Sequence, residues 1–156
     1  MISANRHPAS YQAFGAPVWP DELAGHADPL AGFLTGLTHC KTGYLLTVPC
    51  DTPRLPLDLA ARLGTALQRE QADMALAAAP QSADAAKSGQ STQPVFCLLR
   101  VALQQSLLRF TQDGGRKIAA WCALHATVVV PFDQPGDDPL AFSNLNTLAE
   151  LHQLED

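Results

Sequence analysis

The sequence has few basic residues and no long apolar run. Only 10 of its 156 residues are Lys or Arg, against 15 Asp or Glu, and the basic residues are scattered along the chain. A protein that follows a phosphate backbone needs a basic stripe, so nucleic acid is not an expected partner. No apolar stretch approaches the roughly 20 residues that span a bilayer, and the N-terminus lacks the order of a signal peptide. We therefore expect a cytoplasmic protein without a membrane partner.

Closely spaced cysteines are also missing. Cys40, Cys50, Cys97 and Cys122 lie far apart, with no Cys-x-x-Cys motif among them. This excludes the usual patterns of a zinc site and of a disulfide framework, and it indicates reduced, mostly buried thiols. Cys50 lies next to Asp51, but the sequence places no histidine near it, so we do not expect it to act as a nucleophile.

The remaining composition is ordinary for a globular protein, with 47% hydrophobic and 16% charged residues. This length and composition predict a single domain over residues 1–156. The most informative segment is 44–56, an apolar β-forming run that is stopped by Pro49, Pro53 and Pro56. Asp51 therefore lies at or just past the end of a strand. It has two interpretations, a Mg²⁺ ligand at a sheet edge or a residue that starts a turn.

Helical and strand patterns alternate along the chain. Helical spacing covers 28–39, 56–67, 101–110 and 116–125, and apolar β-forming runs cover 44–48, 74–79, 95–99 and 126–132. Residues 80–94 are polar and of low complexity, which predicts a flexible loop. Gly114-Gly115 is typical of a helix C-cap, and Thr147 with Glu150 fits a capping box that starts a last helix. The alternation predicts a mostly parallel sheet with helices on both faces.

Several short segments follow one another in a distinctive order and at distinctive spacings. They are Ile2-Ser-Ala-Asn-Arg6, Pro17-Val-Trp-Pro-Asp21, Pro29-Leu-Ala-Gly32, Val48-Pro-Cys-Asp-Thr-Pro53, Gln93-Pro-Val-Phe96, Gly115-Arg-Lys117 and Phe142-Ser-Asn-Leu-Asn-Thr147. In these segments, and along its whole length, the chain resembles the molybdenum cofactor guanylyltransferases of the Rossmann-like nucleotidyltransferase superfamily.

The resemblance implies a three-layer nucleotidyltransferase fold and the transfer of GMP from GTP to molybdopterin. Asp51 matches the family's metal-binding aspartate, which implies a site for Mg²⁺, or alternatively Mn²⁺, and so takes the catalytic, metal-binding and nucleotide-binding roles. Asp21 matches a nucleotide-contacting aspartate. Ser3 stands where many members have an asparagine that contacts the nucleotide, and serine has the shorter reach. Proteins of cofactor biosynthesis, or proteins that accept the cofactor, are further expected partners.

Asn144 and Asn146 match the family's paired asparagines on the molybdopterin side, where amides can hydrogen-bond a phosphate. Because Asn is also common in turns before helices, Asn146 could instead only shape the cap of the last helix. Both interpretations remain open from the sequence.

The chain departs from the family at its N-terminus. The family begins with a strand, a Gly-rich loop with Arg and Lys, a helix and a second strand, and Met1 matches a position inside that second strand. We therefore expect an N-terminally truncated fold that lacks the first strand, the Gly-rich loop and the first helix, and that binds GTP weakly. Two alternatives to the guanylyltransferase remain. One is an inactive remnant that binds the cofactor or a partner protein, and the other is a related enzyme with a different base or acceptor.

Overall fold

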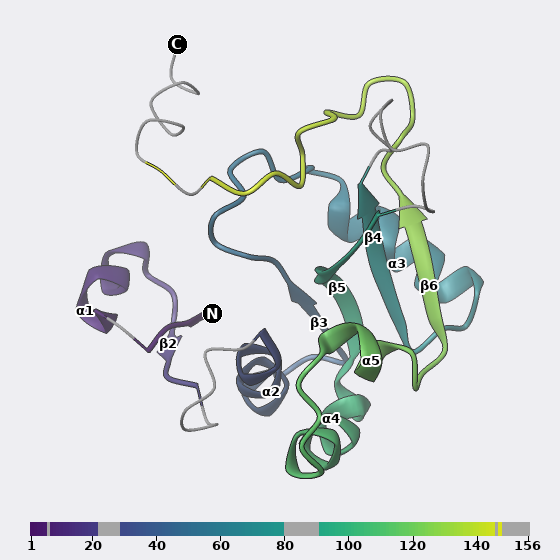
Figure 1. Cartoon of the computed structure of the whole chain (residues 1–156). Helices are drawn as coiled ribbons and strands as arrows, with labels where there is room; N and C mark the ends of the chain where they lie inside the picture. Colours follow the sequence, from purple (N-terminus) through teal and green to yellow (C-terminus); the bar gives the residue numbers. More distant parts are fainter. Residues whose placement is uncertain (6, 22–28, 80–90, 146, 148–156) are drawn as a thin grey trace.

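The structure is a computed structural model that describes residues 1–5, 7–21, 29–79, 91–145 and 147. Within these ranges the chain forms two sheets with helices around them (Figure 1). The strands are β1 (Ile2–Ser3), β2 (Val18–Trp19), β3 (Tyr44–Thr47), β4 (Met74–Ala79), β5 (Ser91–Arg100) and β6 (Thr127–Pro131). The α-helices are α1 (Pro8–Tyr11), α2 (Pro29–His39), α3 (Leu59–Arg69), α4 (Gln104–Gln112) and α5 (Ile118–Cys122), and the 3₁₀ helices are η1 (Gln12–Phe14) and η2 (Val101–Leu103).

Helices cover both faces of the larger sheet, which gives three layers. Strand β4 shows why, since its side chains alternate between two apolar cores. Met74 and Leu76 pack in a core with α2, α4 and α5, whereas Ala75 and Ala77 pack in a second core with α3. The predicted three-layer α/β fold is confirmed. No helix within the described ranges is both long and apolar enough to cross a bilayer.

The larger sheet has the strand order β3-β5-β4-β6. Strands β4 and β6 are parallel, while β5 is antiparallel to both of its neighbours, β3 and β4. Three strands therefore run in one direction and β5 runs in the other. The antiparallel direction of β5 follows from the short connection between β4 and β5. Only residues 80–90 lie between β4 and β5, and neighbouring strands in a sheet can be parallel only if a crossover of about a dozen residues or more joins them.

Strand β5 is longer than the sequence predicted, because it begins at Ser91 and not near Val95. Its register with β4 shifts between Leu76, which pairs with Cys97, and Ala77, which pairs with Gln93. The extra residues include Pro94, and an irregularity of this kind is where a strand tolerates proline. Residues 91–94 of the predicted loop 80–94 are thus part of a strand, and residues 80–90 lie outside the described ranges.

The helix ends follow local hydrogen bonding. At the end of α4, Gly114 has φ +85° and the Gly115 N–H donates to the Phe110 carbonyl at 2.8 Å, which confirms the predicted glycine cap. The helix predicted over 116–125 is shorter, because the Thr127 hydroxyl donates to the Cys122 carbonyl at 2.9 Å and caps α5 there. The predicted last helix lies outside the described ranges.

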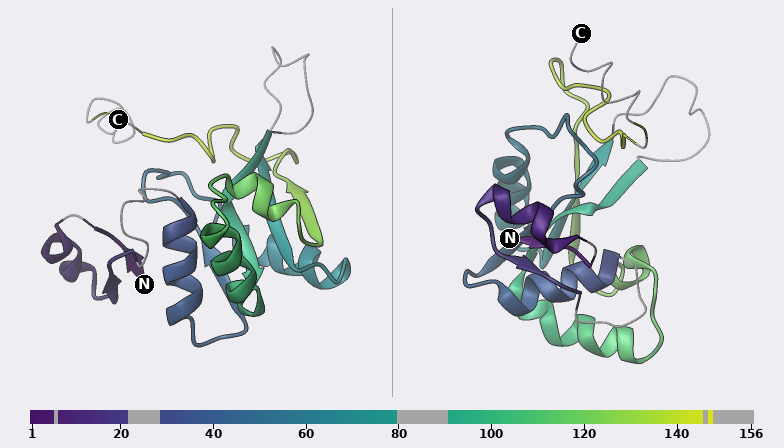
Figure 2. Two further views of the ribbon diagram at one scale, coloured as in Figure 1. Left: turned by 60° about the horizontal axis from the view of Figure 1, so that its bottom comes forward. Right: turned by 90° about the vertical axis from the view of Figure 1, so that its left-hand side faces the viewer.

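Helix α2 lies between the small β1-β2 sheet and strand β3 (Figures 1 and 2). Gly36 allows the close approach of α2 to β3, whereas a side chain at Gly32 would make an ordinary contact. An ideal Cβ on Gly32 would be 3.8 Å from Ser3 Oγ, and one on Gly36 would be only 2.7 Å from Leu45 Cδ2. The Trp19 ring also stacks on the His39 ring, with centroids 3.7 Å apart. Among the described strands, β1 pairs only with β2 and β3 only with β5, so each has one paired edge.

Candidate functional site

Asp51 lies in the loop between β3 and α3, four residues after β3 ends at Thr47. The prolines predicted to end the strand do so, and the loop turns away from the sheet edge. The carboxylate oxygen Oδ1 of Asp51 is buried and has no hydrogen-bond partner among the described residues. A buried acceptor without a donor is costly, and a structural turn gives no reason for it. The environment of Asp51 therefore fits a carboxylate that binds a ligand through Oδ1.

Asn144 lies beside this loop, although the two are far apart in the sequence. The Leu145 N–H donates to the Asp51 carbonyl oxygen at 2.8 Å. The Thr52 hydroxyl also lies 3.5 Å from the Asn144 side-chain oxygen, at the outer limit of a hydrogen bond. Two of the predicted site residues, Asp51 and Asn144, are thus brought together. Asn146 lies outside the described residues.

Two ion pairs hold the segment that carries Asn144 in place. The Arg54 guanidinium contacts the Asp138 carboxylate at 3.1 Å, and Arg62 contacts the Asp137 carboxylate at 2.8 Å. Hydrogen bonds from Arg62 hold the pKa of Asp137 below its usual range. The Leu140 backbone N–H, and then Arg54, do the same for the pKa of Asp138. These ion pairs could not be predicted from the sequence, because each one joins residues more than 70 positions apart.

Aromatic packing supports the same segment from within the second core. The Phe142 ring meets the Phe132 ring edge to face at 5.2 Å and the Phe96 ring at 4.8 Å. Arg62 lies over the Phe132 ring, 3.8 Å from its centroid. Since Phe142 is two residues before Asn144, this cluster sets where Asn144 emerges next to the Asp51 loop.

Ser3 and Asp21 form a second cluster at the ends of β1 and β2. The Ser3 hydroxyl donates to Asp21 Oδ1 at 2.5 Å. Asn5 makes two further bonds, from its Nδ2 to Asp21 Oδ2 at 2.6 Å and from the Asp21 N–H to its Oδ1 at 2.7 Å. The structure thus joins the two predicted nucleotide contacts, and it adds Asn5, to which the sequence analysis assigned no role. Its position two residues after Ser3, on the same side of an extended chain, was the available signal.

The two clusters are not joined by hydrogen bonds or ion pairs in the described part of the chain. No hydrogen bond or ion pair there joins Asp51 to Ser3 or Asp21. The described residues also contain no group of three or more His, Cys, Asp or Glu side chains that could hold a metal by themselves. Asp51 is therefore a single protein carboxylate, which is the usual situation for Mg²⁺ held between a protein and substrate phosphates.

The cysteines are not part of either cluster. Cys97 and Cys122 are buried, Cys40 is partly buried and Cys50 is exposed. Burial raises the pKa of Cys97 strongly and that of Cys122 to about 11. These two thiols are therefore protonated at neutral pH and unreactive. Of the thiols predicted to be mostly buried, these two are buried, whereas Cys50 is exposed.

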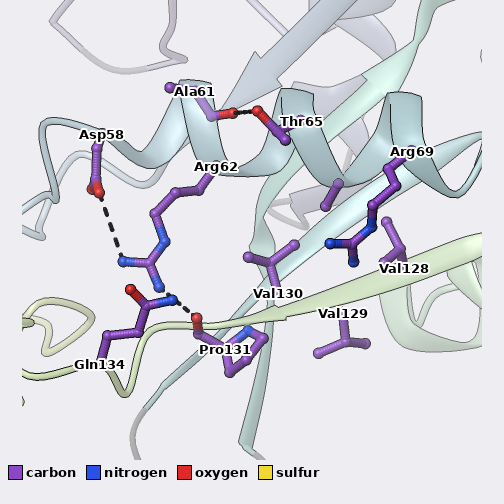
Figure 3. Close-up of a pocket in the computed structure, with 11 residues that line it drawn as sticks. Asp58, Ala61, Arg62, Thr65, Arg69, Val128, Val129, Val130, Pro131 and Gln134 are labelled. Atoms are coloured by element: carbon purple, nitrogen blue, oxygen red, sulfur yellow. Dashed lines mark hydrogen bonds and ion pairs between the residues drawn. The ribbon is translucent and has the colours of Figure 1, made fainter.

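A groove of about 520 Å³ lies elsewhere, between α3 and the edge strand β6 (Figure 3). Its lining residues include Arg62, Arg69 and the valines of β6, but none of the predicted site residues. The Arg62 guanidinium is already used, since it bonds Asp137 and donates to the Pro131 carbonyl at 2.6 Å. The positive charge of Arg62 is therefore paired with Asp137 and is not available to an anionic ligand in the groove.

Known proteins share much of this sequence. Residues 1–128 match the family described as the MobA-like NTP transferase domain. A molybdenum cofactor guanylyltransferase of Albidiferax ferrireducens is 66% identical over 155 residues, which cover 99% of this chain and 74% of that protein. The chain belongs to the molybdenum cofactor guanylyltransferase family. A guanylyltransferase of Bordetella pertussis is 50% identical over 155 residues, with the same coverage of both chains.

A solved structure shows the same fold as this guanylyltransferase-family chain at much lower sequence identity. Molybdopterin-guanine dinucleotide biosynthesis protein A from Archaeoglobus fulgidus superposes with a TM-score of 0.71 at 17% identity. The match covers 98% of this chain and 75% of that one. The predicted family and fold class are thus confirmed, with a sheet that is mixed at β5.

Proposed function

We propose that this chain transfers GMP from GTP to molybdopterin and forms the guanine dinucleotide cofactor. Family membership supports the reaction, and the single observation that carries it is the buried, unpaired Oδ1 of Asp51 beside Asn144. In this reaction the terminal phosphate oxygen of molybdopterin forms a bond to the α-phosphorus of GTP. The bond from that phosphorus to the β-phosphate bridging oxygen breaks, and pyrophosphate leaves.

Asp51 is the residue proposed to hold a divalent cation, Mg²⁺ or alternatively Mn²⁺. Its unpaired oxygen is a hard ligand that suits such an ion, and one protein carboxylate leaves the other positions for phosphate oxygens and water. When bound, the cation would supply electrostatic stabilisation of the charge that develops on the phosphate oxygens. The chain's own contribution is to orient the carboxylate, since the Leu145 N–H fixes the Asp51 backbone.

The other site residues are proposed to orient the two substrates. Asp21 and Ser3 offer oxygens at an accessible end of the small sheet, where they can contact the nucleoside of GTP. Asn144 offers an amide next to Asp51, where it can hydrogen-bond the phosphate of molybdopterin. Asn146 is proposed for the same side from the family resemblance alone. Protein partners of cofactor biosynthesis and a cytoplasmic location remain predictions.

Replacing the metal ligand tests the proposal. We would titrate GTP into the protein with Mg²⁺ and with a chelator, and then assay guanylate transfer to molybdopterin. Asp51→Asn should weaken GTP binding in Mg²⁺ by about tenfold or more, to the affinity measured with the chelator, because it removes a charged ligand. Asp113→Asn, at an exposed position after α4, is the matched control and should change neither.

The outcomes separate the alternatives. Equal Mg²⁺-dependent binding by Asp51→Asn and the unchanged chain would contradict the metal role of Asp51. Binding of molybdopterin without any GTP affinity would support a non-catalytic remnant. A preference for CTP over GTP would support a different base specificity on the same fold.

A further inference from the structure

Asn5 and Asp21 occupy equivalent places at the ends of two neighbouring strands. Strands β1 and β2 are parallel, with Ile2 opposite Val18 and Ser3 opposite Trp19. Asn5 and Asp21 are each two residues farther along, so they continue this register just beyond the paired residues. Side chains two residues apart point to the same side of an extended chain. The cluster of Ser3, Asn5 and Asp21 is therefore a direct consequence of the parallel pairing.

Both the nitrogen and the oxygen of the Asn5 side-chain amide form hydrogen bonds with Asp21. Nδ2 donates to the Asp21 carboxylate at 2.6 Å, and Oδ1 accepts from the Asp21 backbone N–H at 2.7 Å. A flipped amide would place oxygen against oxygen and N–H against N–H. Only one orientation of Asn5 is therefore compatible with Asp21, and the pair forms a closed ring of two hydrogen bonds.

The carboxylate of Asp21 is held from both sides. Ser3 donates to Oδ1 and Asn5 donates to Oδ2. A carboxylate has about four acceptor sites, so each oxygen keeps capacity for another donor. Ser3 and Asn5 are exposed. If the hydrogen bonds among the three side chains broke, water could replace them. Hydrogen bonds of this kind add little to folding, so the main effect of the cluster is to fix the direction of the carboxylate.

The small sheet that carries the cluster is attached to the rest of the fold. The Ala4 N–H donates to the Trp19 carbonyl at 3.0 Å, and the Trp19 ring stacks on His39 at the end of α2. Asp21 follows Trp19 by two residues. The direction of its carboxylate is therefore set with respect to α2 and not only within a loose end of the chain.

We propose that Asn5 is a positioning residue that fixes the Asp21 carboxylate to accept hydrogen bonds from the nucleoside of GTP. This inference rests on the proposed function, because it takes GTP as the ligand of Asp21. Two groups of GTP have the required donors, the N–H edge of guanine and the ribose hydroxyls. A preoriented acceptor loses less entropy on binding than a free one, so removing Asn5 should weaken GTP binding without unfolding the chain.

The experiment measures dissociation constants for GTP, ITP and 2′-deoxy-GTP with the unchanged chain and with Asn5→Ala. We expect Asn5→Ala to weaken GTP binding about five- to tenfold, as the loss of one orienting hydrogen-bond pair would. If Asp21 faces the guanine amino group, the loss should be smaller for ITP, which lacks that group. If Asp21 faces the ribose, the loss should be smaller for 2′-deoxy-GTP.

Two further variants make the result specific. Asn5→Asp keeps the acceptor for the Asp21 N–H but removes the donor to Oδ2, and it should weaken GTP binding at least as much as Asn5→Ala. Gln12→Ala removes an exposed amide from η1 in the same part of the chain and should leave binding unchanged. Thermal unfolding of Asn5→Ala should match that of the unchanged chain, which separates positioning from a structural role.

Failure of the inference and failure of the proposed function would look different. If the unchanged chain binds GTP and Asn5→Ala binds it equally well, the inference is wrong and the proposed function stands. If the unchanged chain binds no GTP, both are wrong. NMR of the free protein gives a test without ligand, because the Asn5 side-chain amide signal should shift in Asp21→Ala. An unchanged signal would overturn the inference.

Discussion

The Leu145 N–H donates to the Asp51 carbonyl oxygen at 2.8 Å and joins the chain after β6 to the loop after β3. The same two segments are joined by Arg54 with Asp138, and Arg62 of α3 holds Asp137 nearby. Together these contacts place Asn144 beside the carboxylate proposed to bind metal.

Asn144→Ala should weaken the binding of molybdopterin and leave the binding of GTP unchanged. The amide lies beside Asp51 and is exposed, so its loss removes a hydrogen bond to the acceptor substrate at little structural cost. We expect KM for molybdopterin to rise about tenfold. Steady-state assays with each substrate varied in turn would measure this. Ser143→Ala, at the exposed neighbouring position, is the control, and an equal rise in KM for GTP would contradict the assignment.

Arg62→Met should lower the free energy of unfolding by about 1–3 kcal/mol, because it removes the donor to the Pro131 carbonyl and leaves Asp137 with only the Gln134 N–H. The side chains of Arg62 and Asp137 are only 17% and 18% exposed, so water replaces these bonds poorly. Urea unfolding measures the change. Arg69→Met is the control, since Arg69 is 72% exposed and its contact with Glu70 should contribute less than about 0.5 kcal/mol. Equal losses of unfolding free energy in Arg62→Met and Arg69→Met would show that the Arg62 contacts do not stabilise the chain more than an exposed ion pair does.

Asp137 should make the stability depend on pH in the acid range. Hydrogen bonds from Arg62 lower its pKa in the folded state, whereas in the unfolded chain the pKa is about 3.9. The folded state thus binds the proton less tightly. The stabilisation is present above the unfolded pKa and is lost as the pH falls through the lower folded pKa. Thermal unfolding followed from neutral pH to below pH 3 should show the loss below about pH 4.

The matched variant for this pH dependence is Asp137→Asn, which should be less stable than the unchanged chain at neutral pH. The difference between the two should shrink as the pH falls. Asp138 also has a lowered pKa, so Asp138→Asn should reduce the same acid dependence. A constant difference between the chains at all pH values would exclude a contribution from Asp137 ionisation.

Gly36→Ala should destabilise the chain by about 1 kcal/mol, because its Cβ would lie 2.7 Å from Leu45 Cδ2. Overpacking costs about 1–3 kcal/mol, and the better helix propensity of alanine offsets up to about 1 kcal/mol of it. In a Leu45→Ala background the clash is absent, so the same change should instead stabilise. Gly43→Ala, with open space around the added methyl group, is the control. Destabilisation in both backgrounds would mean that Leu45 is not the cause.

Much of the architecture could be predicted from local patterns in the sequence. The bounds of β4 match the prediction, and the glycine cap after α4 forms as expected. The prolines after β3 end the strand and leave Asp51 in the loop. These features depend on residues close together in the chain, where side-chain periodicity, missing N–H donors and glycine conformations act directly. Whether Asp51 binds metal or only shapes a turn could not be settled at that level.

Tertiary structure alone decided which side chains meet. The contact of Asn144 with Thr52 joins residues 92 positions apart, and the hydrogen bonds of Asn5 to Asp21 depend on the register of two short parallel strands. The buried, unpaired oxygen of Asp51 likewise results from segments packed around it. The physical reason is that residue type and spacing determine local backbone geometry, whereas long-range neighbours are set by strand order, register and core packing summed over the whole chain.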